Sequence, residues 1–174
     1  RDHRLSLVLT SSGREINIQT NELGKITAVS EPGGRKVEYQ YNDKNQLIFV
    51  KDMFGGQTTY SYDDRNNVTE IAYPDGSKRE ILYKKDTDRI VQLKGPGDRL
   101  TKYEYFNQKG YRVTFDSGYQ VIYQDNMDER QRIVSDNEGI KSILKYNEND
   151  QLVESRDTLG RVSTFAYDAA GRIV

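Results

Sequence analysis

Apolar or aromatic residues alternate with polar residues in short runs along this chain, as in Thr58-Thr59-Tyr60-Ser61-Tyr62. Successive side chains of a β-strand point to opposite faces of a sheet, so each run predicts a strand with one apolar face and one wetter face. No helical period is long enough to interrupt these runs. The pattern therefore predicts an all-β fold of about sixteen strands.

The alternating runs recur with a period of about 21 residues, and a turn glycine marks each copy. The glycine positions are Gly13, Gly34, Gly56, Gly76, Gly97, Gly118, Gly139 and Gly160. A spacing this steady indicates an internal repeat of about eight copies.

Two columns of large side chains keep phase with the turn glycine. The first is apolar or aromatic in every copy: Ile18, Tyr39, Tyr60, Ile81, Tyr103, Tyr123, Leu144 and Phe165. The second, called here the tyrosine column, follows two residues later: Thr20, Tyr41, Tyr62, Tyr83, Tyr105, Asp125, Tyr146 and Tyr167. A spacing of two places both columns on one face, where we expect the rings of successive copies to form an aromatic ladder.

Short turns separate the runs. Those after the tyrosine column begin with Asp or Asn and often end with Gly or Asn, as in residues 42–45, 63–66 and 168–171. A first-position Asp or Asn can accept hydrogen bonds from the turn's own backbone, and Gly or Asn at the fourth position tolerates positive φ. Connections this short require antiparallel neighbours, so each copy is predicted to be strand, turn, strand, turn.

The last copy, with Gly160-Arg161, Tyr167-Asp168 and Gly171-Arg172-Ile173, shows the pattern most fully. Tyr followed by Asp or Asn occurs in four copies: Tyr41-Asn42, Tyr62-Asp63, Tyr146-Asn147 and Tyr167-Asp168. This pattern resembles the Rhs or YD-repeat family, which includes bacterial polymorphic toxins, the shell subunits of Tc toxins and the teneurins. The copies containing Tyr83, Tyr105 and Asp125 are degenerate versions of it.

The resemblance covers residues 12–174. We interpret residues 1–11, with their alternating leucines, as the strand of a partial preceding copy, and residues 12–174 as about eight copies, the last one truncated. The expected fold is one open, curled antiparallel sheet. Its unpaired edges are expected near Leu5–Leu9 and Thr164–Tyr167, and pairing of such edges predicts end-to-end self-association.

Composition narrows the range of partners. The 174 residues carry 26 basic and 27 acidic side chains and a net charge of −1, so no basic surface for nucleic acid is expected. No apolar run approaches the roughly 20 residues of a membrane span. The chain has no cysteine, which excludes disulfides, and thirteen tyrosines must supply much of its apolar area.

Few residues are candidates for chemistry. His3 is the only histidine, and we expect it to be a solvated terminal residue rather than a metal ligand. No cofactor motif is present. Several turn carboxylates are candidates for calcium, but they lack the spacing of a calcium loop, which favours turn capping. They are Asp43, Asp63, Asp64, Asp125, Asp128 and Asp168.

The resemblance implies a non-enzymatic structural segment of a secreted or cell-surface bacterial protein. Such a segment belongs to a β-sheet shell that encapsulates or presents a C-terminal toxin domain, and its partners are neighbouring repeats and that domain. The alternative is an adhesive or carbohydrate-binding module that uses the tyrosine-rich face. The structural repeat positions are Gly34, Gly76, Gly118, Gly139, Gly160, Gly171, Tyr39, Tyr41, Tyr60, Tyr62, Tyr83, Tyr103, Tyr105, Tyr123, Tyr146, Tyr167 and Asp168.

Overall fold

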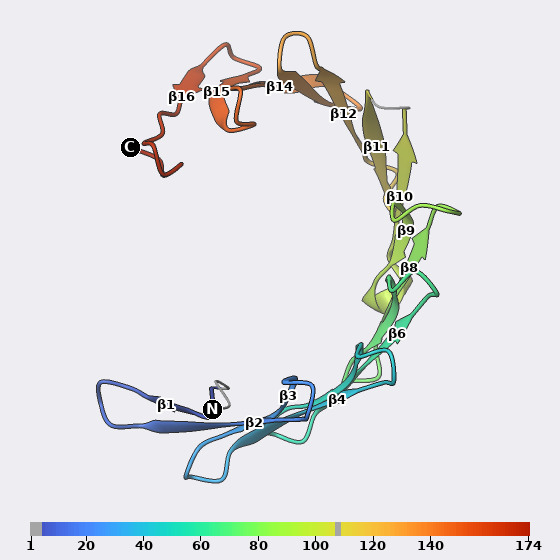
Figure 1. Cartoon of the computed structure of the whole chain (residues 1–174). Coiled ribbons are helices and arrows are strands. Elements are labelled where there is room, and N and C mark those ends of the chain that lie inside the picture. The colour runs from blue at the N-terminus through green and yellow to red at the C-terminus, as the bar shows by residue number, and fades with distance from the viewer. Residues whose placement is uncertain (1–4, 107–108) are drawn as a thin grey trace. The chain divides into compact units, whose positions relative to one another are not determined.

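The computed structural model describes residues 5–106 and 109–174, so His3 lies outside the described residues. The described residues form sixteen β-strands and one short 3-10 turn, η1, at Pro96–Asp98 (Figure 1). The strands are β1 (Leu7–Leu9), β2 (Glu15–Thr20), β3 (Ile26–Ser30), β4 (Lys36–Tyr41), β5 (Leu47–Lys51), β6 (Gln57–Tyr62), β7 (Val68–Ala72), β8 (Lys78–Tyr83), β9 (Ile90–Lys94), β10 (Leu100–Tyr105), β11 (Gly110–Phe115), β12 (Gln120–Asn126), β13 (Gln131–Asp136), β14 (Gly139–Tyr146), β15 (Leu152–Asp157) and β16 (Val162–Thr164).

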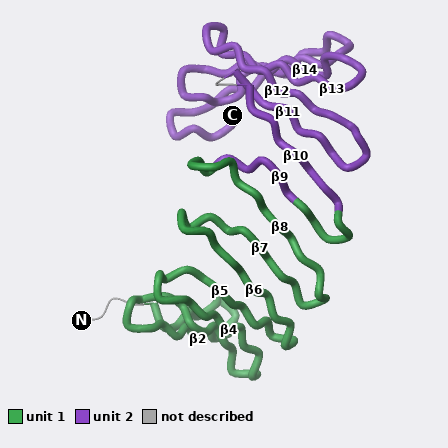
Figure 2. Tube along the Cα trace, turned by 90° about the vertical axis from the view of Figure 1, so that its right-hand side faces the viewer, with its two compact units in different colours: residues 1–88, 94–98 green, residues 89–93, 99–174 purple. Residues whose placement is uncertain are grey.

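The chain divides into two compact units, residues 1–88 with 94–98 and residues 89–93 with 99–174 (Figure 2). Strands β1 to β8 of the first unit pair consecutively and antiparallel, and so do β10 to β16 of the second. Strand order in the sheet is the order of the chain. The prediction of an all-β, open antiparallel sheet is confirmed, while its curl stays a prediction.

One turn geometry closes most hairpins at both ends of the strands. The N–H of Asn42 donates to the carbonyl of Gln46 at 3.0 Å, and the N–H of Asn45 donates back to the carbonyl of Asn42 at 2.9 Å. Asn45 has a φ of 61°, the left-handed conformation of a type I turn that ends in a β-bulge. Turns of this kind start 11 and 10 residues apart in alternation, which produces the period of 21: Thr10, Asn21, Glu31, Asn42, Asp52, Asp63 and Tyr73.

The turn glycine of the third copy is Gly55, which corrects the assignment to Gly56. Gly55 has a φ of 88°, and its N–H donates to the Asp52 carbonyl at 3.1 Å, whereas the carbonyl of Gly56 accepts from the N–H of Asp52. A Gly-Gly pair leaves this choice open in the sequence. With the correction, glycines with positive φ recur every 21 residues at Gly13, Gly34, Gly55, Gly76, Gly97, Gly118, Gly139 and Gly160.

The sheet has almost no buried core. Among the described residues only Ala28 in β3 and Val113 in β11, with 4% and 7% exposure, are buried. In β6 the side chains of Tyr60 and Tyr62 are half-buried while Ser61 between them is exposed. The two faces therefore differ as the alternation predicts, and the face that carries Tyr60 and Tyr62 is called the tyrosine-rich face below.

The leucines at the start of the chain are more exposed than their pattern indicates. Leu5, Leu7 and Leu9 are 62%, 42% and 63% exposed, and only Val8 between them is half-buried. The cause is the position of β1, which has β2 as its only strand neighbour in the described chain. The side chains of an edge strand pack against those of one neighbouring strand only, so they stay more exposed.

The free backbone edge of β1 follows from its pairing. The N–H of Thr10 donates to the carbonyl of Arg14, and the N–H of Ile18 donates to the carbonyl of Ser6. Hydrogen-bonded pairs alternate in an antiparallel ladder, so Leu7 and Leu9, which fall between them, direct their N–H and C=O groups to the free edge.

The other free edge is shorter than expected. Strand β16 pairs with β15 through Val162 to Thr164. The chain then folds back, and the N–H of Val174 donates to the carbonyl of Ala166 while Tyr167 bridges Ile173. The predicted edge at Thr164–Tyr167 is therefore corrected, since only the part in β16 remains open.

Replacement of Gly110 tests the close packing of β11 on β12. An added Cβ at Gly110 would lie 1.9 Å from the carbonyl oxygen of Tyr123, and the residue has a φ of 132°. At Gly76, with a φ of 81°, an added Cβ meets nothing within 4 Å. We expect Gly110→Ala to lower the free energy of unfolding by about 3 kcal/mol and Gly76→Ala by about 1 kcal/mol, measured by urea denaturation. Equal losses in the two variants would contradict the close approach.

Candidate functional site

Most tyrosines of the tyrosine column bond to the strand before their own. The hydroxyl of Tyr62 in β6 donates to the carbonyl of Leu47, the first residue of the neighbouring strand β5, at 2.7 Å. We call this hydrogen bond the tyrosine clip. Five members of the column make it, each to a carbonyl 15 residues earlier: Tyr41 to Ile26, Tyr62 to Leu47, Tyr83 to Val68, Tyr105 to Ile90 and Tyr167 to Leu152.

Partial burial keeps the hydroxyl groups of Tyr62 and Tyr83 protonated, so they can donate in the clip. The half-buried positions raise the pKa of Tyr62 and of Tyr83, and for both the main cause is the loss of water around the ring. A raised pKa keeps the phenol protonated at neutral pH, so it can donate to the carbonyl. Sequence reasoning required a partner for each hydroxyl, but nothing in the sequence marks a carbonyl 15 residues away.

Two of the three degenerate copies nevertheless keep the clip. Tyr83 and Tyr105 are followed by Lys84 and Phe106, yet their hydroxyl groups reach the expected carbonyls at 3.0 Å. The clip therefore does not require Asp or Asn after the tyrosine.

The aromatic ladder across copies is not formed. Tyr39 lies in β4 and Tyr60 in β6, with β5 between them, so the rings of one column are separated by two strand spacings, about 9.6 Å. Ring contacts require centroids within about 7 Å. The residues opposite the first column are aliphatic instead: Val50 faces Tyr39, Ile71 faces Tyr60 and Val113 faces Tyr103.

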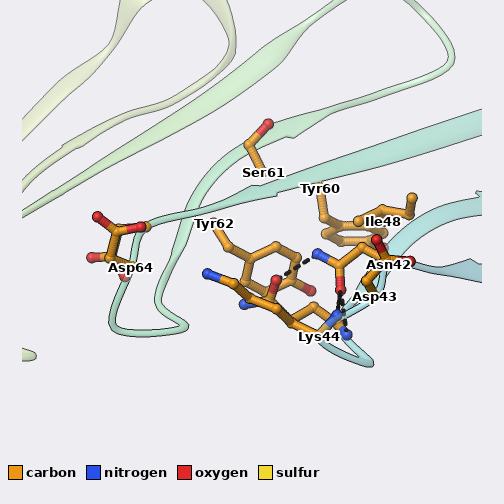
Figure 3. A pocket seen from close by; sticks show the side chains of 10 residues that line it. Asn42, Asp43, Lys44, Ile48, Tyr60, Ser61, Tyr62 and Asp64 are labelled. Carbon is orange, nitrogen blue, oxygen red and sulfur yellow. Dashed lines mark hydrogen bonds between the residues drawn. The ribbon is translucent and has the colours of Figure 1, made fainter.

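Figure 3 shows a regular part of the tyrosine-rich face, a pocket of about 430 Å³. The rings of Tyr60 and Tyr62 line it with Ile48, and Ser61 points away from it. At its rim the side chain of Asn42 accepts hydrogen bonds from the N–H groups of Lys44 and Gln46, both at 3.0 Å. In a regular copy the two tyrosine rings therefore form one wall of an open pocket beside the turn.

Two of the candidate carboxylates cap their own turns. Asp63 Oδ1 accepts from the N–H groups of Arg65 and Asn67, both at 2.9 Å. Asp168 Oδ1 does the same for Ala170 and Arg172, and the hydrogen bond from the Arg172 N–H is the main cause that lowers the pKa of Asp168. An ionised carboxylate is the stronger acceptor, so these caps are complete at neutral pH.

The described residues contain no cluster of acidic or histidine side chains arranged to hold a metal ion. In the same part of the chain, no helix is long and apolar enough to cross a bilayer.

The second unit carries a continuous stack of rings and guanidinium groups that sequence reasoning missed. Tyr111 in β11 lies between Tyr105 and Tyr123, with ring centroids 5.9 Å and 4.7 Å apart. The guanidinium of Arg89 lies over Tyr105 at 5.2 Å, and that of Arg132 lies over Tyr123 at 6.0 Å. Tyr111 is outside both columns, and only its position opposite Tyr105 and Tyr123 brings the rings together.

At one end of this stack the tyrosine column is interrupted. Asp125 stands in the column and faces Arg132 across the β12–β13 pair. The two form a bidentate ion pair, with Arg132 Nε 2.6 Å from Oδ1 and Nη2 3.1 Å from Oδ2 of Asp125. A pocket of about 440 Å³ lies beside this pair, lined by Asp125, Asn126, Met127, Arg130, Gln131, Arg132, Tyr146 and Asp150.

Comparison with known proteins supports the repeat assignment. The RHS repeat family model matches residues 41–78 and 146–174. No curated protein matches the chain. The fold is similar to a chain of the Photorhabdus luminescens Tc holotoxin pore that contains a mutant TccC3, with a TM-score of 0.63 and 10% identity over 92% of this chain and 11% of that one.

Two further solved structures resemble the chain. TcdB2-TccC3 without its hypervariable C-terminal region gives a TM-score of 0.61, and TcdB2-TccC3 gives 0.60, each at 10% identity over 92% of this chain. This chain spans 10% of the length of each of those two chains. At 10% identity, these comparisons show that the fold is shared and nothing more.

Removal of one hydroxyl tests the tyrosine clip. We expect Tyr62→Phe to lower the free energy of unfolding by about 1 kcal/mol, because the Leu47 carbonyl loses its donor while the ring stays in place. Tyr146→Phe is the matched control, since the Tyr146 hydroxyl has no hydrogen-bond partner among the described residues, and it should leave stability unchanged. Urea denaturation measures both, and equal losses would show that the clip adds nothing.

Proposed function

We propose, from the premise that this chain belongs to the Rhs (YD) repeat family, that it is a non-enzymatic structural segment of a toxin shell. In this proposal the segment forms part of a β-sheet wall that encapsulates or presents a toxin domain in a secreted or cell-surface bacterial protein. The single observation that carries the proposal is the tyrosine clip, which repeats through both units and serves the assembly of hairpins.

A wall needs units that can be added without a shared core. Each hairpin here contacts only its neighbours, and only two of the described residues are buried. Stability in such an array is approximately the sum of the units and their nearest-neighbour interfaces, so the sheet can grow with the number of copies. The division into a partial copy at residues 1–11 and an array at residues 12–174 remains part of this proposal.

The two faces differ in a way that suits a wall. Thr59 and Ser61 are exposed on the polar face of β6, whereas Tyr60 and Tyr62 are half-buried on the other face. A wall that separates a payload from solvent requires two sides of different character. An adhesive module that uses the whole tyrosine-rich face has less support, because five hydroxyl groups are already bonded to backbone carbonyls.

Site-specific cross-linking in the complete gene product tests the shell. A photoreactive phenylalanine derivative is placed either at Tyr60, on the tyrosine-rich face, or at Ser61, on the polar face. We expect cross-links to the toxin domain from one of the two positions only, because a shell presents one face to its payload. Products are identified by mass spectrometry after digestion. Cross-links from both positions alike, or from neither, would contradict a wall around a payload.

We further propose that the isolated chain associates end to end through its free edges. Leu7 and Leu9 offer unpaired backbone groups, β16 offers a second free edge, and neither strand contains proline. Exposed edges of this kind pair with other strands unless they are blocked.

Sedimentation velocity tests this association. We expect the mean sedimentation coefficient to rise with protein concentration, and Leu7→Pro to weaken that rise, because proline removes an N–H that points to the free edge. Val8→Pro is the comparison variant, since the same alternation turns the Val8 N–H toward β2, and it should instead loosen β1. A strict monomer at all concentrations would show that the edges do not pair.

A further inference from the structure

One charged side chain lies on the tyrosine-rich face of the first unit. Arg79 in β8 is half-buried and faces Ile71 of β7 across the strand pair. The two preceding copies have Val37 and Thr58 at the same place, each opposite a valine of the strand before. Alternation along the described strands β2 to β8 gives this face uncharged residues at every other position, so Arg79 is the exception.

The guanidinium group of Arg79 has no hydrogen-bond or ion-pair partner among the described residues, and its Nε atom is buried. The Nε of Arg112 is also buried and unpaired, but the Nη1 of Arg112 donates to Glu104 at 2.8 Å. Burial of a donor without an acceptor destabilises a fold. Elsewhere in the described chain five arginines donate Nε to a carboxylate: Arg35, Arg65, Arg132, Arg161 and Arg172.

The carboxylates of β7 and β8 lie on the other face of the sheet. Glu70 faces Glu80 in the pair next to Ile71 and Arg79, and successive residues of a strand point to opposite faces. On that polar face Lys78 already balances Glu70, with Nζ 3.2 Å from both carboxylate oxygens. The strands around Arg79 therefore leave its charge unbalanced.

The surface beside this charge is apolar. Ile71 lies opposite Arg79, and Tyr60 of β6 lies opposite Ile71 on the other side of β7. These two neighbours are about 4.8 Å and 9.6 Å from Arg79, one and two strand spacings away. Alternate side chains of an extended peptide lie about 6.7 Å apart, so one can reach Arg79 while the next rests between Ile71 and Tyr60.

A single guanidinium group matches a single carboxylate. It can offer Nε and Nη2 side by side, as Arg132 does to Asp125 at 2.6 Å and 3.1 Å. A phosphate group carries a charge of about −1.5 to −2 at neutral pH, and the described strands β2 to β8 hold no second cation on this face. The charge and its apolar surroundings favour an acidic side chain that has apolar neighbours.

We propose that the tyrosine-rich face of β6 to β8 binds an extended peptide segment of a partner chain. A glutamate or aspartate of that segment pairs with Arg79, and an apolar side chain two residues away packs on Ile71 and Tyr60. The carboxylate supplies the acceptor that the buried Nε lacks. This function is independent of the shell and of the free edges, because it uses one face of neighbouring strands within the first unit.

Titration of the chain with short peptides tests the proposal. The probe is the capped pentapeptide Val-Thr-Glu-Thr-Val, whose valines and glutamate share one side of an extended backbone. The control peptide has glutamine in place of the glutamate. Binding is followed in NMR spectra by the Nε–H signal of Arg79. We expect saturable binding of the glutamate peptide, and about tenfold weaker binding of the glutamine peptide, the effect of one charge-assisted contact.

Two results of this titration would overturn the proposal. The first is equal affinity for the two peptides, or no saturable shift of the Arg79 signal with the glutamate peptide. The second is tighter binding of inorganic phosphate, titrated in parallel, than of the glutamate peptide.

Variants on the two faces of β8 locate the site. Arg79→Gln removes the charge and keeps the length of the side chain, and we expect the preference for the glutamate peptide to disappear. Lys78→Gln is the matched control, because it removes a cation of the same strand from the polar face, and it should keep the tenfold preference. A preference that survives in Arg79→Gln, or that is lost in Lys78→Gln, would overturn the proposal.

A second substitution decides the question if Arg79→Gln does not fold. Arg79→Lys keeps the positive charge and removes the Nε donor with its planar fork, so the preference for the glutamate peptide should fall to about threefold. An unchanged preference in Arg79→Lys would show that the buried Nε takes no part in binding and would contradict the proposed pairing.

Discussion

The geometry of the turns controls the rest of this structure. Most turns place their fourth residue in the left-handed conformation, as at Asn45 and Gly76, and so fix the register of the two strands that they join. A shift of one residue would move every tyrosine of a strand to the opposite face. Because turns at both ends of the strands share this geometry, the register is set again at every hairpin, and the columns stay in phase along each unit.

A sheet of this kind is stabilised without a conventional core. With Ala28 and Val113 as the only buried residues in the described chain, stability comes from contacts between adjacent strands, capped turns and the tyrosine clips. The clip adds a side-chain tie between hairpins that otherwise share only a backbone ladder, and it does so at the same position in each copy that has it. This explains why the tyrosine persists at Tyr83 and Tyr105, where the rest of the repeat pattern is lost.

Departures from a repeat are informative because the regular copies define what each position does. Tyr62 shows that the ring lines the space beside the turn and that its hydroxyl donates to a backbone carbonyl. Asp125 makes neither contribution, and an ion pair with Arg132 stands in their place. The second unit differs again in its stack of Tyr105, Tyr111 and Tyr123.

The sequence by itself determined the features that depend on neighbouring residues. The two-residue alternation established the strands and their two faces, and Asp or Asn at the start of a turn identified the caps at Asp63 and Asp168. The period of 21 established the repeat. These features were predictable because strand alternation and turn chemistry act within a few residues of the chain.

The tertiary structure decided what depends on which strands lie side by side. Same-column tyrosines are two strands apart, so the expected ladder does not form, and Tyr111, which lies outside the columns, stacks instead. The clip joins a hydroxyl to a backbone carbonyl, an acceptor that every residue carries, and for that reason no residue type marks it in the sequence. The exposure of Leu7 likewise follows from the place of β1 at an edge, which alternation alone does not reveal.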